Sequence, residues 1–297
     1  MDDQEGFQSV LGYKLYYRSA GPPDASTTVL TLHGGPGSSH DYLLSLRDLT
    51  RWGYRVVFFD QLGCGRSEIP PGTDLFSLAH HVEETEGIRT SLGLGRVHLI
   101  GSSYGGLLAL AYAIKYQEHL RSLVTVGGLA DVPFAQAEMN RLIDALPKAD
   151  GEAIRVHGTR GEFTHPDYVR ARDRFYHSYL CRLPAWPPEL TRSLEYGDQR
   201  PVYRYMNGPD EFTITGTIHD LSLVADLPKI RVPTLVIGGR YDEVTPALAQ
   251  QIHSTIAGSR RITFERSSHT PFWEERERFM ETVGAFLQDV DRAGARP

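Results

Sequence analysis

One serine stands in a pattern that favours nucleophilic chemistry. The run Gly101-Ser102-Ser103-Tyr104-Gly105 matches G-x-S-x-G, and it comes directly after the apolar run Val97–Ile100 and before the helical pattern Leu107–Tyr116. A serine on such a strand-to-helix turn is strained and exposed, and the glycines let neighbouring backbone come close. The pattern alone is weak in a chain with 29 glycines, but the strand and the helix supply its context. We expect Ser103 to be a nucleophile; the alternative is a turn whose serine only caps the helix.

A histidine and an acid are needed to activate a serine hydroxyl. In folds that carry a serine on such a turn, the acid and then the histidine follow the serine along the chain. Asp242 lies in the loop after the apolar run Thr234–Ile237, and His269 follows the short run Ile262–Phe264. Both positions are strand ends, so we expect Ser103 to attack, His269 to carry the proton and Asp242 to orient the imidazole. The other histidines are expected to be exposed or structural.

The oxygen that becomes negative in acyl transfer needs N–H donors already in place. The backbone N–H of Tyr104, the residue after the serine, is one expected donor. The second is expected from the glycine-rich turn His33–Gly37, and within it from Gly35, because Pro36 has no N–H to offer. The alternative for this turn is a purely structural task. A second glycine-rich turn, Asp60–Ser67, matches no phosphate-binding loop, and we expect it to pack beneath the first.

Apolar runs of strand length alternate with helical patterns along most of the chain. Runs without polar interruption, separated by helices, indicate a parallel sheet that is covered on both faces. The segments Phe7–Val10 and Lys14–Tyr17, on either side of Gly12, predict an antiparallel hairpin at one edge. The fold class is therefore α/β, with a mostly parallel central sheet flanked by helices. The predicted strands are Val29–Leu32, Val56–Phe59, Val97–Ile100, Leu123–Val126 and Thr234–Ile237, and the predicted helices are Tyr42–Arg51, Leu78–Leu92, Tyr104–Tyr116, Pro246–Ile256 and Pro271–Gln288.

The alternation stops after Gly128 and resumes near Val232, which leaves about a hundred residues rich in Arg, Tyr, Trp and Pro. This stretch predicts helices rather than sheet. An insertion between two parallel strands lies over their carboxyl ends, where open α/β sheets bind ligands. We therefore expect a core of residues 1–128 and 229–297 and a helical cap subdomain of residues 129–228 that shapes the substrate pocket.

Composition restricts the classes of partner. The 297 residues carry a net charge of −6 without a long run of Lys or Arg, so we expect neither nucleic acid nor a membrane surface as a partner. The two cysteines, Cys64 and Cys181, lack metal-ligand spacing, and we expect no disulfide framework, no metal and no cofactor. The first residues are acidic and no long apolar segment follows, so we expect a cytoplasmic protein. The oligomeric state is not predicted.

Several motifs together resemble those of the proline iminopeptidase family of α/β hydrolases, which release an N-terminal residue from peptides. The resemblance spans nearly the whole chain and is greatest to the branch of tricorn-interacting aminopeptidases. It implies the α/β-hydrolase fold with an inserted cap. The core motifs are His33–Gly37, Asp60–Ser67, Gly101–Gly106, Gly239–Pro246 and Ser268-His269; the branch is indicated by Ser39–Arg47, Glu138–Asp144 and Asn207–Thr217.

The resemblance implies that a pair of carboxylates, Glu211 and Glu243, holds the free α-amino group of the substrate. Two carboxylates can accept two of the three protons of an ammonium group. The alternatives are a solvated loop carboxylate for Glu243 and a structural ion pair for Glu211. Tyr203 and Trp186 are candidate walls of an apolar pocket, although most aromatic residues only fill a core. The expected substrates are short peptides or amino-acid amides with a free N-terminus.

The leading hypothesis is a serine aminopeptidase that releases an N-terminal proline or another apolar residue through an acyl-enzyme, as in a prolyl aminopeptidase. An amino-acid amidase or an esterase would use the same triad. A relative of the same fold that binds a ligand without turning it over belongs to a different class, and the complete set of nucleophile, acid, base and donor loop disfavours it. The sequence leaves open the preferred first residue and the accepted peptide length.

Overall fold

The computed structural model of the protein describes residues 3–294. In these residues the chain forms an eight-stranded sheet with the order β1-β2-β4-β3-β5-β6-β7-β8. The pairs β1·β2 and β2·β4 are antiparallel and all other pairs are parallel. The strands are β1 (Gln4–Val10), β2 (Tyr13–Ala20), β3 (Thr28–Leu32), β4 (Arg55–Phe59), β5 (Val97–Ser102), β6 (Leu120–Val126), β7 (Thr234–Gly239) and β8 (Arg260–Phe264).

The central strands are buried on both faces, which is why their sequences are apolar without interruption. Every residue of β3, β5 and β7 is buried. Alternate side chains point to opposite faces of a strand; in β3, Leu30 and Leu32 enter one apolar cluster and Val29 enters the other. The predicted fold class and the five predicted strands are confirmed. The edge hairpin is also present, and its strands extend beyond the predicted ends.

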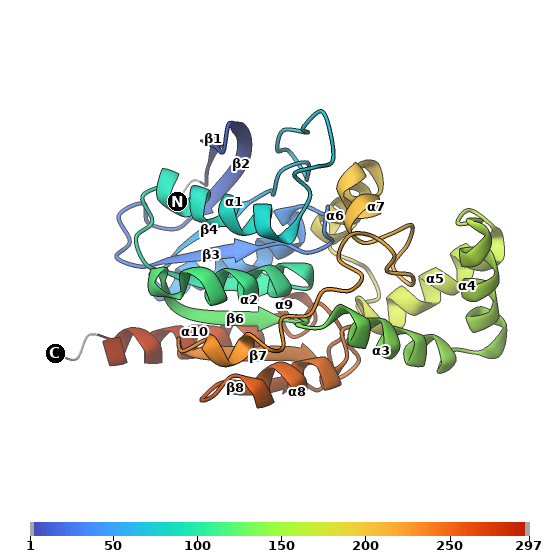
Figure 1. Cartoon of the computed structure of the whole chain (residues 1–297). Coiled ribbons are helices and arrows are strands. Elements are labelled where there is room, and N and C mark those ends of the chain that lie inside the picture. Colours follow the sequence, from blue (N-terminus) through green and yellow to red (C-terminus); the bar gives the residue numbers. More distant parts are fainter. Residues whose placement is uncertain (1–2, 295–297) are drawn as a thin grey trace.

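Helices cover both faces of the sheet (Figure 1). Helices α1, α2 and α8 pack with one apolar cluster, and η1, α9 and α10 pack with the other. Their bounds are η1 (His40–Trp52, a 3₁₀ helix), α1 (Leu78–Ser91), α2 (Tyr104–Tyr116), η2 (Gln117–His119, also 3₁₀), α8 (Pro246–Thr255), α9 (Pro271–Glu274) and α10 (Arg276–Gly294). In the described residues, no helix combines the length and the apolar character needed to cross a membrane.

Two helix predictions need correction. The segment predicted as a helix over Tyr42–Arg51 is a 3₁₀ helix that begins at His40. The helix predicted over Pro271–Gln288 is divided into α9 and α10 at Glu275. The Glu275 side chain is buried and accepts hydrogen bonds from the Arg266 amide and the Ser267 hydroxyl, so this residue holds the preceding loop instead of continuing one straight helix.

The chain between β6 and β7 forms five α-helices at the carboxyl ends of the strands (Figure 1). It has an apolar cluster of its own, which joins residues of its first three helices, such as Ile154 and Phe175, to Phe212 near its end. At its base, the Asp131 carboxylate accepts a hydrogen bond from the Ser222 hydroxyl, and the two backbones form an isolated antiparallel bridge. The helices are α3 (Val132–Asp144), α4 (Lys148–Arg160), α5 (Pro166–Tyr179), α6 (Pro188–Gln199) and α7 (Pro201–Met206), and the 3₁₀ helix η3 (Leu227–Lys229) leads back to β7.

The segments predicted as the core and the cap can be placed on this structure. Residues 129–228 contain all five of these helices, and the predicted core contains the whole sheet. The first two and last three residues of the predicted core lie outside the described residues.

Candidate active site

Ser103 lies on the sharp turn between β5 and α2. Its backbone has φ 58° and ψ −128°, a left-handed conformation that is strained for a residue with a side chain. Such strain persists where the surroundings enforce it, and here the Ser103 amide donates to the Val126 carbonyl while its own carbonyl accepts from Gly106. A Cβ at Gly105 would lie 2.2 Å from the carbonyl oxygen of Leu32, so the motif glycine lets α2 approach β3. The turn raises the Ser103 hydroxyl above the sheet.

His269 and Asp242 form a buried pair at the ends of β8 and β7. The distance from His269 Nδ1 to Asp242 Oδ1 is 2.6 Å, and the two residues are only 4% and 1% exposed. The Asp242 carboxylate also accepts the backbone N–H of Val244 at 2.9 Å, which fixes its orientation. With Nδ1–H donated to Asp242, His269 Nε2 is the nitrogen left to exchange a proton.

Ser103 and His269 line the same cavity, but no hydrogen bond joins Ser103 Oγ to His269 Nε2 in this structure. Contacts of this kind are often long without a substrate and shorten when it binds. The acidic group nearest to Nε2 is instead Glu243, whose Oε1 lies 3.8 Å away. The imidazole therefore faces a carboxylate on the side that a serine base must keep free.

The residues of the two expected N–H donors, Tyr104 and Gly35, lie next to Ser103 in the sequence or in the cavity. Tyr104 is the first residue of α2, and the first amides of a helix have no partner within it. The Tyr104 phenol is 2.7 Å from Nδ1 of the buried His81, which anchors this residue on its other side. Gly35, on the loop of residues 33–39 after β3, lines the cavity beside Ser103. Tyr42 supports the loop, because its phenol accepts the Gly34 N–H and donates to the Ser102 carbonyl.

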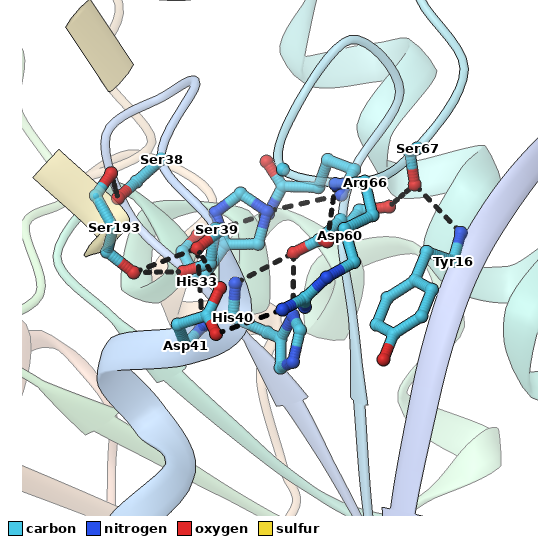
Figure 2. A network of polar contacts seen from close by, with 12 residues as sticks. Tyr16, His33, Ser38, Ser39, His40, Asp41, Asp60, Arg66, Ser67 and Ser193 are labelled. Carbon is cyan, nitrogen blue, oxygen red and sulfur yellow. Dashed lines mark hydrogen bonds and ion pairs between the residues drawn. The ribbon is translucent and has the colours of Figure 1, made fainter. Parts of the chain in front are cut away.

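A network of polar contacts beneath loop 33–39 connects it to the turn 60–67 (Figure 2). The Asp60 carboxylate is 2.8 Å from both the backbone N and the Nδ1 of His40 and accepts the Arg66 amide at 2.9 Å. His33 Nε2 accepts the Gln61 amide. Although burial raises the pKa of Asp60, its hydrogen bond and charge contact with His40 lower that pKa to about 2. The second glycine-rich turn thus contacts the first, where the sequence predicted it.

Helix α6 is joined to the same loop through Ser193 (Figure 2). Ser193 Oγ lies 2.9 Å from Ser39 Oγ and accepts the Tyr42 amide at 3.0 Å, and the Ser193 carbonyl accepts the Ser38 hydroxyl. Beside it, Arg192 donates to the fully buried Asp41 at 2.8 Å. These contacts connect residues more than 150 positions apart and fix α6 against loop 33–39.

The two carboxylates expected at an amine site lie together in the cavity. Glu211 and Glu243 both line it, and Tyr203 donates its phenolic hydrogen to Glu211 Oε2 at 2.8 Å. The backbone of Tyr203 packs on Gly37, where a Cβ would lie 2.8 Å from its nitrogen. Glu243 is 5% exposed, and its Oε2 has no hydrogen-bond partner among residues 3–294. A buried carboxylate oxygen without a donor is costly unless a ligand supplies one.

The charges in this cluster shift one another's titration. Burial raises the pKa of Glu211, and the Tyr203 hydrogen bond offsets part of that effect. Burial and then the charge of Glu211 raise the pKa of Glu243 well above its ordinary value. Burial lowers the pKa of His269, but the charge and hydrogen bond of Asp242 and the charges of the two glutamates together raise it to about 9. A cationic group is therefore favoured among these carboxylates.

The cavity has a volume of about 260 Å³, and its lining includes Ser103, His269 and, from loop 33–39, Gly35 and Ser38. The helices between β6 and β7 supply aromatic walls, among them Phe163, Tyr176 and Tyr203. Of the two aromatic residues proposed for the pocket, Tyr203 lies in it and Trp186 does not. The Trp186 indole N–H donates to the Cys181 carbonyl, and its ring lies beside His177 and the lining residue Tyr176 without lining the cavity itself.

Three positions in this site escaped the sequence reasoning. The Tyr179 carbonyl at the end of α5 accepts the amides of both Glu243 and His269 at 3.2 Å. Tyr42 and Ser193 support loop 33–39. The contact made by Tyr179 uses its backbone carbonyl, which every residue has, so the residue type does not indicate it. Tyr42 and Ser193 stand in helical patterns, where a tyrosine or a serine gives no sign of a special role. The resemblance over Ser39–Arg47 marked the region of Tyr42 without giving it a task.

One group of possible metal ligands occurs in the described residues, namely His157, His165 and Asp167. This group lies at the surface turn between α4 and α5, and it contains neither Ser103 nor His269 of the cavity. The two imidazole rings are stacked with centroids 3.8 Å apart and planes 15° apart. In-plane lone pairs of parallel rings do not converge on one ion, so coordination would require at least one ring to rotate.

Comparison with known proteins finds relatives that agree with one another in family. A family model described as alpha/beta hydrolase fold matches residues 27–276. A proline iminopeptidase of Thermoplasma volcanium is 47% identical over 96% of this chain and 97% of its own length. A proline iminopeptidase of Saccharolobus solfataricus is 44% identical over 97% of this chain and 93% of its own.

Solved structures agree with this result. The crystal structure of VinJ matches with a TM-score of 0.93 and 36% identity, over 97% of this chain and 99% of that one. The crystal structure of a proline iminopeptidase from Mycobacterium smegmatis matches with a TM-score of 0.92 and 32% identity, over 98% of this chain and all of the other.

Proposed function

Because the chain belongs to the α/β-hydrolase fold family and, within it, to the proline iminopeptidase family, we propose that it is a serine aminopeptidase of the prolyl type. It releases an N-terminal proline or another apolar residue from short peptides. The resemblance to the tricorn-interacting branch is part of this proposal. So is the role of residues 129–228 as a cap over the site.

In the proposed reaction His269 Nε2 takes the proton of Ser103 as the hydroxyl oxygen attacks the carbonyl carbon of the first residue. Asp242 keeps the imidazole oriented and stabilises its cationic form. The amides of Gly35 and Tyr104 donate to the negative oxygen. His269 then gives its proton to the leaving amine, and a water molecule, activated in the same way, releases the amino acid from Ser103.

The observation that carries the choice of substrate is the unpaired Oε2 of Glu243. This oxygen is buried, belongs to a residue that lines the same cavity as Ser103, and lies in a cluster that favours a cation. An ammonium group of a substrate would supply the missing donor and contact Glu211 as well. A small cavity with aromatic walls fits an apolar first residue followed by a short leaving group.

The proposal is tested with prolyl 4-nitroanilide and its N-acetyl derivative. We expect turnover of the free amine and at least about 100-fold slower turnover of the acetylated compound, because the latter brings no charge to the glutamates. Ser103→Ala should abolish turnover, whereas the matched control Ser254→Ala, which removes an exposed hydroxyl on α8, should not. Equal rates for the free and blocked substrates would contradict the assignment of Glu211 and Glu243.

An amino-acid amidase or esterase would share the triad and the amine site. The size of the leaving group separates these activities, so the panel includes prolinamide, a proline ester and a prolyl dipeptide. A preference for the dipeptide supports the peptidase. Cys64 and Cys181 are both buried and unpaired, which is compatible with the cytoplasmic location that we propose.

A further inference from the structure

The side of His269 that must receive the serine proton faces a carboxylate. Glu243 Oε1 lies 3.8 Å from His269 Nε2, and both residues are about 5% exposed in their side chains. Ser103 Oγ makes no hydrogen bond to this nitrogen. In a buried site an imidazolium and a carboxylate at this distance attract one another strongly, so Glu243 competes with Ser103 for Nε2.

The groups whose charge shifts the pKa of His269 come from two segments, and all of them are acidic. Asp242 and Glu243 stand on the loop after β7, and Glu211 stands on the segment after α7. From α5, the Tyr179 carbonyl accepts the His269 amide, and the Tyr176 phenol lines the same cavity beside the two glutamates. Arg172 and Arg204 also line the cavity, but neither is among the groups whose charge shifts the pKa of His269. The free protein therefore favours a proton on His269.

We infer that Glu243 is a positioning residue for His269 as well as a ligand of the substrate amine: it pairs with the imidazolium until an ammonium group replaces it. This inference rests on the proposed function. When the ammonium binds, Glu243 pairs with the ligand, the Nε2 proton leaves to solvent, and neutral His269 becomes free to accept the proton of Ser103. The amine then acts on the rate of the chemical step and not only on binding.

The state of His269 can be read with a reagent that has no amine. Diisopropyl fluorophosphate phosphorylates an activated serine: the Ser103 Oγ–P bond forms, the P–F bond breaks, fluoride leaves and the serine proton passes to His269. Its rate of incorporation, followed by intact mass between pH 5.5 and 10, reports the fraction of neutral imidazole. For the unmodified protein we expect the rate to rise with an apparent pKa near that of His269, about 9.

Pyrrolidine supplies the cation without a carbonyl group to attack. At pH 7 a saturating concentration should accelerate phosphorylation about ten-fold, since each unit by which a base's pKa falls toward the ambient pH raises its neutral fraction by up to that factor. Cyclopentanol, a neutral molecule of similar size, should not accelerate it. Calorimetric titration with pyrrolidine shows separately whether the cation binds.

The variant Glu243→Gln provides a second, independent test that needs no added ligand. It should phosphorylate faster than the unmodified protein at pH 7, with a lower apparent pKa, and should respond little to pyrrolidine, while its turnover of prolyl 4-nitroanilide falls. The matched control Glu265→Gln removes an exposed carboxylate beyond β8 and should leave the profile unchanged. A purely structural loss would slow both reactions and could not accelerate one of them.

The outcomes separate this inference from the proposed function. If pyrrolidine binds but leaves the phosphorylation rate unchanged or slows it, or if Glu243→Gln slows phosphorylation at pH 7, the inference is wrong and the amine site stands. If pyrrolidine does not bind, or if Ser103 is not the phosphorylated residue, the proposed amine site or nucleophile fails, and the inference falls with it.

Discussion

Ser193 on α6 and Ser39 on loop 33–39 are in direct contact: the two hydroxyl oxygens are 2.9 Å apart, and Ser193 Oγ also lies 3.1 Å from the Ser39 carbonyl oxygen. Both side chains are buried. A helix of the inserted segment therefore takes part in holding the loop that carries Gly35. In the proposed mechanism, the geometry around the developing negative oxygen would therefore depend on residues that are distant in the sequence from Ser103, Asp242 and His269.

Replacing Ser193 by alanine should loosen loop 33–39. Because small displacements of positioned groups slow the chemical step, kcat for prolyl 4-nitroanilide should fall about ten-fold while KM changes by less than about two-fold. The lost hydrogen bonds should lower the free energy of unfolding by about 1–2 kcal/mol. Steady-state kinetics and urea unfolding measure both. Ser254→Ala is the control, and an unchanged kcat would refute the coupling.

Tyr203→Phe removes the hydrogen bond to Glu211 Oε2. Since this hydrogen bond lowers the pKa of Glu211, its loss should raise that pKa further and reduce the charge available to the amine. We expect KM for prolyl 4-nitroanilide to rise about five- to ten-fold at neutral pH, which corresponds to roughly 1 kcal/mol. Tyr205→Phe, which changes the exposed tyrosine of the same helix, should behave as the unmodified protein. A change in kcat alone would argue against this account.

Glu84→Gln should alter how stability depends on pH. Glu84 is fully buried on α1, accepts the Leu62 amide, and has a pKa that burial raises to about 8. Above the ordinary glutamate pKa of 4.5 the unfolded chain has lost this proton, whereas the folded protein keeps it until about pH 8. The stability that the protonated group contributes is therefore fully present below pH 4.5 and is lost as pH rises through about 8. Glutamine has no proton to lose.

Urea unfolding at pH 6 and pH 9 tests this expectation. Between these two pH values the free energy of unfolding of the unmodified protein should fall more than that of Glu84→Gln. The difference in stability between the two proteins should therefore shift in favour of the variant at pH 9. Glu118→Gln, at an exposed carboxylate, is the matched control. Parallel pH profiles for Glu84→Gln and the unmodified protein would mean that Glu84 is not protonated in the fold.

Asp60→Asn should have the opposite dependence. Asp60 has its pKa lowered to about 2, so its contribution to stability is present above the ordinary aspartate pKa of 3.8 and is lost as pH falls toward 2. At pH 7 we expect a loss of about 3 kcal/mol, because the amide cannot satisfy the same buried donors. Urea unfolding at pH 7, 4 and 3 should show that the difference in the free energy of unfolding between Asp60→Asn and the unmodified protein becomes smaller as the pH falls. Asp24→Asn, on an exposed turn, should show no such trend.

Local patterns identified the parts of the site that belong to single strand ends. Ser103 stands directly between the buried strand β5 and helix α2, and Asp242 and His269 also follow strands. These relationships are readable because the carboxyl ends of parallel strands share one edge. The fold class followed from the same apolar runs.

What the sequence could not supply are the contacts across long separations. The support of loop 33–39 by Ser193 and the packing of Tyr203 on Gly37 depend on how α6 and α7 dock. The aromatic content of the inserted segment predicted pocket walls, but Trp186 does not line the cavity, and its indole donates to the Cys181 carbonyl. The break at Glu275 likewise arises from a buried acceptor that two loop residues use.

The bridge between Asp131 and Ser222 makes the inserted segment resemble an exchangeable module. The segment leaves and rejoins the core at two adjacent backbones, and it buries an apolar cluster of its own that includes Phe212 near its end. A chimaera that exchanges residues 132–221 for those of a relative would need to match this junction, the docking of Arg192, Ser193 and Tyr203, and the contacts that Tyr179 and Glu138 make with the core. Evolution has the same route to new specificities: one lineage can inherit the triad unchanged and acquire its preferred substrate by recombination at two neighbouring points.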